Sequence, residues 1–185
     1  AWADVLIETL VDALMKVTGV TTVIMNGTGR ARTLEGLEEK TIVMRGTAPT
    51  GPIEATMNGA TYMADVMGGQ KTGLFFDQRP NHAFAANLAK GGDVLDMFSH
   101  VGGFGLAALA NGAKSVLAVD GSAPALELAN AGAAAMGVSD KFETRRGDAF
   151  AVLEALAEEG AQFDVVICDP PAFAPVWAQR NLPGI

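Results

Sequence analysis

Acidic and glycine residues lie at or just beyond the ends of four short apolar runs in the second half of the chain. Asp96 and Gly102 belong to the first of these segments, Asp120 to the second, Asp148 to the third and Asp169 to the fourth. If the four runs are parallel strands of one sheet, their carboxyl ends meet at one edge, which is where α/β sheets bind ligands. We therefore interpret these residues as the lining of one ligand site.

Each segment suits a different part of a single ligand. The glycines of segment 102–105 allow the backbone to approach a bound molecule, and the helix that follows offers free N–H groups to a carboxylate. Asp120 is placed to accept hydrogen bonds from both hydroxyls of a ribose. Asp148 can accept from an exocyclic amine, while the N–H of Ala149 or Phe150 can donate to a ring nitrogen. Together these groups describe an adenosine that carries an amino-acid tail.

The same glycines also fit a dinucleotide fingerprint, Gly103-x-Gly105-x-x-Ala108. In dinucleotide folds the first glycine follows the strand almost directly, whereas here Asp96 precedes Gly103 by seven residues. A nicotinamide cofactor would also leave Asp96 and the segment Asp169–Phe173 without a role. The residues therefore favour S-adenosyl-L-methionine over NAD.

Strands and helices alternate through this half of the chain, and they must position the site. We expect strands at Val94–Met97, Ser115–Val119, Lys141–Arg145 and Phe163–Cys168. We expect helices at Gly103–Ala110 and Ala149–Glu159. Ser122 is a candidate cap for a further helix, which has Pro124 in its first turn and runs through Ala135. This alternation with short connections predicts an α/β fold with a Rossmann-like, doubly wound parallel sheet.

Residues 1–67 have a different pattern, which predicts a small α+β unit ahead of the ligand-binding half. Val5–Val17 has apolar residues at helical spacing, and two short β-branched runs follow it. Asn58-Gly59 stands between two extended runs, which is the strongest short-range signal for a β-hairpin. We place the boundary at about residue 68, so that the predicted domains are 1–67 and 68–185.

Composition excludes several classes of protein. Hydrophobic residues make up 49% of the 185 residues, which supports a packed core, and no apolar run reaches the roughly 18–20 residues of a membrane span. The single cysteine excludes an intrachain disulfide and a cysteine-based zinc cluster. Together with an N-terminus unlike a signal peptide, it favours a cytoplasmic location. His82 and His100 lack a third ligand nearby, so we expect no metal site.

The net charge of −8 argues against a broad basic surface for nucleic acid within this chain. An RNA partner would need a basic surface outside the chain, or a local one. Arg145-Arg146 could contact a phosphate, although a solvated strand end is the favoured interpretation.

Three motifs carry a resemblance to a known family. They are Gly69-Gln70-Lys71-Thr72-Gly73-Leu74-Phe75-Phe76-Asp77-Gln78-Arg79, LDMFSHVGGFG at 95–105 and DPPAF at 169–173. Together they resemble the RlmI-like family of large-subunit ribosomal RNA methyltransferases, which are class I S-adenosylmethionine-dependent enzymes. The resemblance is strong over about 68–175 and weaker over 1–67, which is similar to the central α+β domain of the family. It implies a class I fold and 5-methylation of cytosine in 23S rRNA.

The resemblance also implies roles for matching residues. The implied cofactor-binding residues are Asp77, Arg79, Asp96, Ser99, Gly102, Asp120, Ser122, Asp148 and Ala149. Of these, Asp96, Ser99 and Gly102 would line the methionine side, and Asp77 and Arg79 would close over the cofactor. The implied catalytic residues face the target base, and they are Asp169, Pro170, Pro171 and Phe173. Phe75-Phe76 could cover the cofactor or pack under the loop, and both interpretations stay open.

The sequence also departs from the family pattern. Methylation at C5 of cytosine needs a nucleophile, normally a Cys thiolate, which in the family lies well downstream of the DPP motif. This chain ends fourteen residues after Pro171, contains four of the seven expected strands and lacks the RNA-binding PUA domain of the family. We interpret Cys168 as a small buried strand residue rather than the nucleophile. We expect the chain to be a fragment whose last strand, at an unprotected edge, promotes self-association.

Two other functions remain open at this point. One is a cofactor-binding fragment without turnover of its own. The other is a methyltransferase that acts on a small molecule or a protein, which the acidic pI of about 4.7 would suit.

Overall fold

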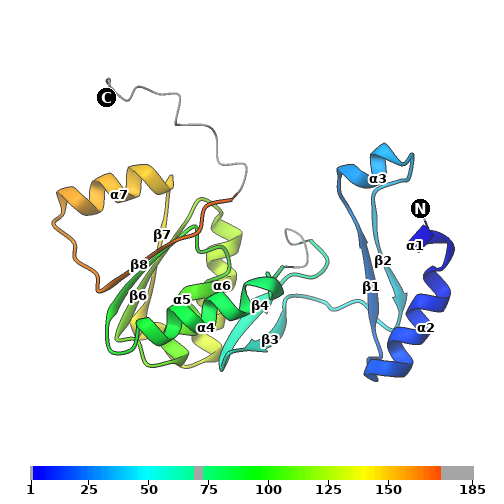
Figure 1. Ribbon diagram of the computed structural model, residues 1–185, viewed down its shortest axis with the longest axis horizontal. Coiled ribbons are helices and arrows are strands. Elements are labelled where there is room, and N and C mark those ends of the chain that lie inside the picture. The colour runs from blue at the N-terminus through cyan, green and yellow to red at the C-terminus, as the bar shows by residue number, and fades with distance from the viewer. Residues whose placement is uncertain (1, 69–72, 172–185) are drawn as a thin grey trace. The chain divides into compact units, whose positions relative to one another are not determined.

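The chain forms two compact units, which are described separately below (Figure 1). The computed structural model describes residues 2–68 and 73–171. The first unit contains the residues up to Ile53 together with Ala64–Gly73. The second contains Glu54–Met63 and the chain from Leu74 onward, and it holds all four strands that carry the predicted site.

A four-stranded parallel sheet forms the centre of the second unit, in the order β7-β6-β5-β8. Its strands are β5 (Asp93–Met97), β6 (Ser115–Asp120), β7 (Phe142–Arg146) and β8 (Val165–Cys168). The predicted parallel sheet and its four strands are therefore confirmed. Because β5 lies between β6 and β8, residues at its carboxyl end are flanked by the loops that follow both neighbours.

Helices cover both faces of this sheet, as expected for a doubly wound fold (Figure 1). The helices of this unit are α4 (Arg79–Leu88), α5 (Gly103–Ala110), α6 (Ala123–Ala135) and α7 (Ala149–Glu158), with short 3-10 turns η1 (Phe76–Gln78) and η2 (Ser139–Lys141). None of the helices in the described part of the chain combines the length and the apolar character needed to cross a membrane. The three helices predicted after β5, β6 and β7 are present, whereas α4 was not predicted.

Alternation along β5 and β6 divides the core between the two faces. On one face the strand residues pack against α7 in a cluster formed by Leu95, Met97, Leu117, Val119, Ala149, Val152 and Leu156. On the other face α5 approaches the sheet at Gly105, where an added Cβ would lie 2.8 Å from Val116 Cγ1 and 3.2 Å from Asp96 Oδ2. The side chain of Asp96 therefore lies on the α5 side of the sheet.

The predicted hairpin is present as β3 (Ile53–Met57) and β4 (Ala60–Ala64). Asn58 and Gly59 have φ values of 52° and 78°, the positive values that a type I′ turn requires. Within the second unit, Tyr62 is fully buried, and its hydroxyl donates to the Gly103 carbonyl at 3.0 Å. The boundary predicted at residue 68 assigns the hairpin to the first unit, whereas this contact ties residues 54–63 to the second.

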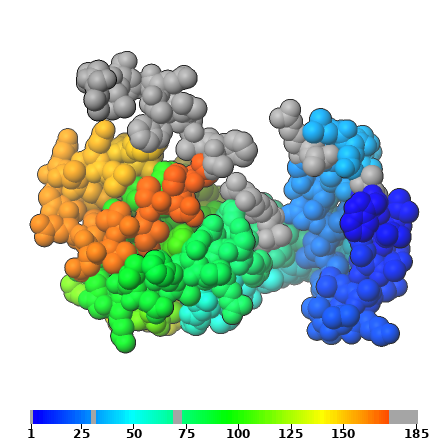
Figure 2. Space-filling view, viewed as in Figure 1, coloured from blue at the N-terminus to red at the C-terminus, as the bar shows by residue number. Residues whose placement is uncertain are grey.

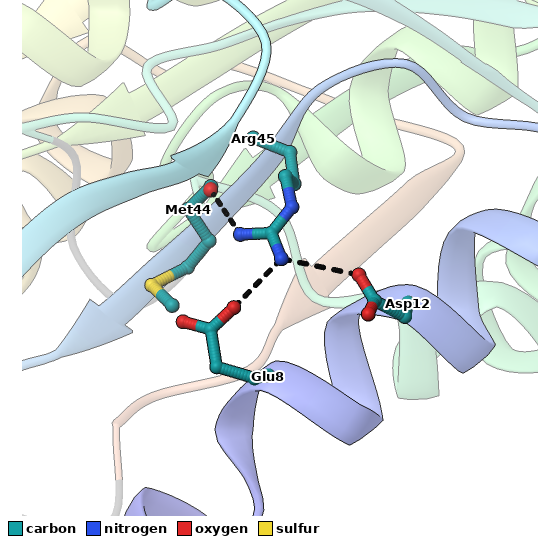
Figure 3. A network of polar contacts seen from close by, with 4 residues as sticks. All are labelled: Glu8, Asp12, Met44 and Arg45. Carbon is teal, nitrogen blue, oxygen red and sulfur yellow. Dashed lines mark hydrogen bonds and ion pairs between the residues drawn. The ribbon is translucent and has the colours of Figure 1, made fainter.

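The first unit contains α1 (Trp2–Val5), α2 (Ile7–Thr18), α3 (Arg30–Leu34) and an antiparallel pair formed by β1 (Val23–Gly27) and β2 (Lys40–Arg45). The helix predicted over Val5–Val17 is thus interrupted at Leu6, where φ is −100° and ψ is 9°. Arg45 links β2 to α2 by donating to Glu8 at 2.6 Å and to Asp12 at 3.1 Å (Figure 3). Since these side chains are largely exposed, we expect the ion pairs to contribute little stability.

Strand β8 lies at the edge of the sheet within the described part of the chain, because β5 is its neighbour on one side only. Residues of this strand, orange in Figure 2, are open to view on one face of the second unit. Val166 is 56% exposed. The self-association expected from an open edge stays a prediction.

The close approach of α5 to the sheet yields a stability prediction. We expect Gly105→Ala to lower the free energy of unfolding by about 1–3 kcal/mol, because the added methyl overlaps Val116. This loss should exceed the gain from the higher helix propensity of alanine. Gly51→Ala is the control, because a Cβ there meets nothing within 4 Å. Equal denaturant midpoints for the two variants would contradict the prediction.

Candidate active site

The carboxyl group of Asp96 is buried at the centre of the candidate site. Asp96 is 1% exposed, and its Oδ2 accepts a hydrogen bond from the Gly105 N–H at 2.8 Å. Its Oδ1 is buried and has no hydrogen-bond partner in the described part of the chain. Burial, opposed by the Gly105 hydrogen bond and assisted by the charges of Asp120 and Asp169, raises the pKa of Asp96 to about 7.

The loop that follows β5 has an unusual backbone conformation. Phe98 and His100 have positive φ values of 59° and 51°, a region that non-glycine residues adopt uncommonly. Ser99 lies between them and is 4% exposed, and its hydroxyl is buried without a hydrogen-bond partner in the described part of the chain. Gly102 ends the loop with a φ of 81°, where a Cβ would also lie 3.1 Å from Leu106.

Buried polar atoms of Asp96 and Ser99 at this loop thus lack partners within the described residues. Buried polar groups are nearly always hydrogen-bonded, so each such atom calls for an explanation. A polar ligand held by this loop would supply one. The family resemblance implies that these two residues line the methionine side of S-adenosylmethionine, and this role stays a prediction.

Asp120 joins the loops that follow β5 and β6. Its Oδ2 accepts from the His100 N–H and its Oδ1 from the Ser122 N–H, both at 2.8 Å. Each carboxylate oxygen retains capacity for another hydrogen bond, so the group can still accept from a ribose diol. The Ser122 hydroxyl accepts from Ala125 N at 3.3 Å, and this confirms Ser122 as the cap of α6.

Asp148 occupies the corresponding position after β7, where it caps α7. Its Oδ1 accepts from the N–H groups of Phe150 and Ala151, both at 3.1 Å. The Phe150 N–H that the sequence offered to a ring nitrogen is therefore already engaged. Asp148 itself is exposed, whereas Ala149 is 8% exposed. The second carboxylate oxygen of Asp148 is the group on this loop that could accept from an amine.

The remaining predicted residues lie on either side of this centre. Asp77 and Arg79 are exposed at η1 and at the start of α4, and the Arg79 carbonyl accepts from the Asn58 amide at 2.8 Å. Asp169, Pro170 and Pro171 are exposed directly after β8. Phe173 and residues 69–72 lie outside the described residues.

His82 is a buried residue near the site. The sequence indicated that it is not a metal ligand and indicated no other role for it. It is 4% exposed on α4, its ring centroid lies 4.5 Å from that of Phe104, and its Nδ1 has no partner in the described part of the chain. Burial lowers the pKa of His82, and Asp169 and Asp77 oppose that effect. A Cβ at Gly103 would lie 3.0 Å from the imidazole, so the ring packs directly against residues 102–105, which we call the glycine loop.

Several interpretations outside the site can also be compared with the structure. Cys168 is exposed, so its expected burial was wrong, because edge strand β8 leaves alternate side chains open to solvent.

Arg145 pairs with Glu159 at 3.1 Å, and Arg146 donates to the Gly121 carbonyl at 3.2 Å. The ring of Phe75 packs edge-on against that of His100 at 5.4 Å. Among the described residues, no three His, Cys, Asp or Glu side chains form a group that could hold a metal.

Comparison with known proteins supports the same fold. A family model described as Conserved hypothetical protein 95 matches residues 78–181. The chain is 40% identical over 177 residues to a Ribosomal RNA large subunit methyltransferase I from Vibrio vulnificus (strain YJ016). The match covers 94% of this chain and 45% of that relative, so the chain spans less than half of the relative's length.

Solved structures share the architecture. A protein assigned as a methyltransferase and solved as a complex with S-adenosylhomocysteine has a TM-score of 0.78 at 23% identity, which covers 94% of this chain and 44% of the other. The tRNA m1G37 methyltransferase of M. jannaschii has a TM-score of 0.64 at 18% identity, which covers 91% of this chain and 46% of the other. These likenesses confirm the expected methyltransferase fold.

The buried carboxyl of Asp96 makes the stability of the chain depend on pH. Its pKa rises from 3.8 to about 7 on folding, so the folded chain holds a proton that the unfolded chain releases between these values. Ionisation of Asp96 therefore destabilises the fold as pH rises through this window. The amide of Asp96→Asn cannot ionise, so this variant should not lose that stability. We expect the difference in free energy of unfolding, Asp96→Asn minus the unmodified chain, to grow by about 1.4 kcal/mol per pH unit in this window. Urea unfolding at pH 5 and pH 8 measures this gap, and a gap that does not change would contradict it.

Proposed function

The chain belongs to the Conserved hypothetical protein 95 family and has the fold of class I S-adenosylmethionine-dependent methyltransferases, and from this we propose that it forms the cofactor-binding part of an enzyme that methylates ribosomal RNA. The observation that carries the choice of substrate is the 40% identity, over 94% of the chain, to a large-subunit rRNA methyltransferase. The observation that carries the choice of cofactor is the row of acidic residues at the carboxyl edge of the sheet.

We assign the parts of the cofactor to successive loops of the second unit. The partly exposed carboxylate of Asp120 would hold the ribose hydroxyls, and its two backbone bonds fix it for that purpose. The free oxygen of Asp148 would accept from the adenine amine. The buried Asp96 and Ser99 would face the methionine part, while Asp77 and Arg79 would close over it from η1 and α4.

The chain contributes binding and orientation rather than a reactive group of its own. When bound, S-adenosylmethionine supplies an electrophilic methyl group on a positively charged sulfur. The loops after β5 and β6 would hold this group in one orientation, and such positioning lowers the barrier to a two-reactant transfer. Asp169, Pro170 and Pro171 would meet the target base, because they follow β8 beside the centre of the site and two consecutive prolines restrict the backbone. Phe173 would stack on that base.

The base and the atom that are methylated form the finer part of the proposal. Resemblance to the RlmI-like family supports C5 of cytosine in 23S rRNA. That reaction requires a thiolate that adds to the ring. Cys168, the single cysteine of the chain, is the residue before Asp169 and is exposed, but the family pattern assigns the nucleophile to a position further downstream.

The net charge of −8 has to be reconciled with an RNA substrate. We infer that the basic surface for RNA lies in parts of the enzyme outside these 185 residues, since the chain spans 45% of its rRNA-methylating relative. The negative net charge also favours a second candidate function, in which the enzyme methylates a small molecule or a protein. A cytoplasmic location also stays a prediction.

Cofactor binding can be tested by calorimetric titration with S-adenosylhomocysteine. We expect the chain to bind it, and we expect Asp120→Ala to weaken binding at least tenfold, because the ribose loses its acceptor. Asp140→Ala is the matched control, since Asp140 lies in η2 before β7, at the opposite end of that strand from the site. Thermal melts must accompany the titration, because Asp120 also holds two loops. A folded chain that binds no S-adenosylhomocysteine would contradict the proposed function.

The substrate can be tested by transfer of a labelled methyl group. We expect the enzyme that contains this chain to move label from S-adenosylmethionine into unmodified 23S rRNA. Asp120→Ala in the same enzyme should reduce the label in RNA to background, and Asp140→Ala should leave it unchanged. Label found in protein or small molecules, with none in rRNA, would favour the second candidate instead.

A further inference from the structure

We propose that Asp96 responds to the charge on the sulfur of the cofactor: it is protonated in the empty site and releases its proton when the positively charged sulfonium binds. The neutral sulfur left after methyl transfer would not support the ionised form, so the site would distinguish the reactive cofactor from its product. This inference rests on the proposed function. It assigns to Asp96 a task beyond lining the methionine side of the site.

The strand order puts Asp96 at the right place for this task. β5 lies between β6 and β8 in the sheet, so Asp96 lies between the ends of these strands, which carry Asp120 and Asp169. In the proposed function Asp120 holds the ribose and Asp169 meets the target base. The sulfur is the atom that links the adenosine to the transferable methyl, so in the proposed function it would lie between those two groups, near the strand that carries Asp96.

The surroundings of Asp96 leave a position for one proton or one cation. Its Oδ2 is engaged by the Gly105 N–H at 2.8 Å, while its buried Oδ1 has no partner in the described residues. A buried carboxylate with one oxygen that accepts no hydrogen bond is unfavourable unless a proton or a nearby cation neutralises its charge. The proton satisfies this requirement in the empty site, and a positively charged sulfur would satisfy it in the complex.

The groups that face Asp96 from neighbouring elements favour the protonated form. Asp120 acts on it from the end of β6 and Asp169 from beyond β8, and both are acidic. Tyr62 lies on β4 and carries no charge, because burial raises the pKa of its phenol. α5 contributes the Gly105 N–H, which alone favours the carboxylate. Burial is the largest influence, and together with the charges of Asp120 and Asp169 it outweighs the Gly105 bond and raises the pKa of Asp96 to about 7.

The consequence is a proton that moves with each catalytic cycle. Binding of the sulfonium form releases the Asp96 proton to solvent. Methyl transfer converts the sulfonium to a neutral thioether, and Asp96 then takes a proton back from solvent. The ionised carboxylate would favour the reactive cofactor, and the reprotonated one would no longer hold the product by charge.

The proton can be counted by calorimetry on the unmodified chain. Each ligand is titrated at pH 6 in two buffers with different ionisation enthalpies, because the difference in heat gives the number of protons released. At this pH the α-amino groups of both ligands stay protonated, since such groups titrate at about 7.7–8.0. We expect S-adenosylmethionine to release close to one proton and S-adenosylhomocysteine to release none.

Affinity should follow the same pattern. Between pH 5 and pH 7 we expect the affinity for S-adenosylmethionine to rise up to about tenfold per pH unit, while that for S-adenosylhomocysteine stays level. Asp96→Asn should abolish both the proton release and the slope. Asp93→Asn is the matched control, because Asp93 is a carboxylate at the opposite end of the same strand, paired with Lys114 at 2.8 Å, and it should preserve them.

Each outcome bears on the inference. Equal proton release by the two ligands, or release that persists in Asp96→Asn, would overturn it while leaving the proposed function intact. If neither ligand binds the folded chain, the proposed function fails and the inference fails with it. If Asp96→Asn does not fold, the comparison of the two ligands on the unmodified chain still decides the question.

Discussion

Helix α5 can approach β5 and β6 closely only because residue 105 has no side chain. The approach buries Val116 and brings the Gly105 N–H to 2.8 Å from Asp96, so one packing constraint joins the core of the sheet to the centre of the site. The loop before the helix then has little freedom, and it completes its path with positive φ values at Phe98 and His100. Asp120 fixes the loop from the other side by binding the His100 N–H.

Charge at this edge of the sheet is as constrained as packing. Asp96 and Asp120 lie in β5 and β6, Asp169 directly follows the neighbouring β8, and Asp96 is almost completely buried. In the second unit the helix caps Ser122 and Asp148 use part of their hydrogen-bonding capacity within the fold. The proposed function assigns one of these caps, Asp148, to the cofactor as well.

Patterns with a regular period predicted the fold well. The strands β5–β8 and the helices after three of them follow from apolar runs and turn residues, and Asn58-Gly59 specified the hairpin turn. Helix α4 was missed because its buried residues are His82 and Ala86, which form no apolar stripe, and His82 was missed with it. The exposure of Cys168 depends on which strands flank β8 in the sheet, and a local pattern does not contain that information.

The hydrogen bond from Tyr62 to the Gly103 carbonyl has a consequence for where an autonomous folding unit begins. A chain shortened to start at residue 68 would keep every cofactor-binding residue assigned above, yet it would lose the hairpin and the fully buried Tyr62 ring. The glycine loop would then have an open cavity beside it and a carbonyl without its donor. The smallest piece that preserves the shape of this loop must start ahead of residue 54.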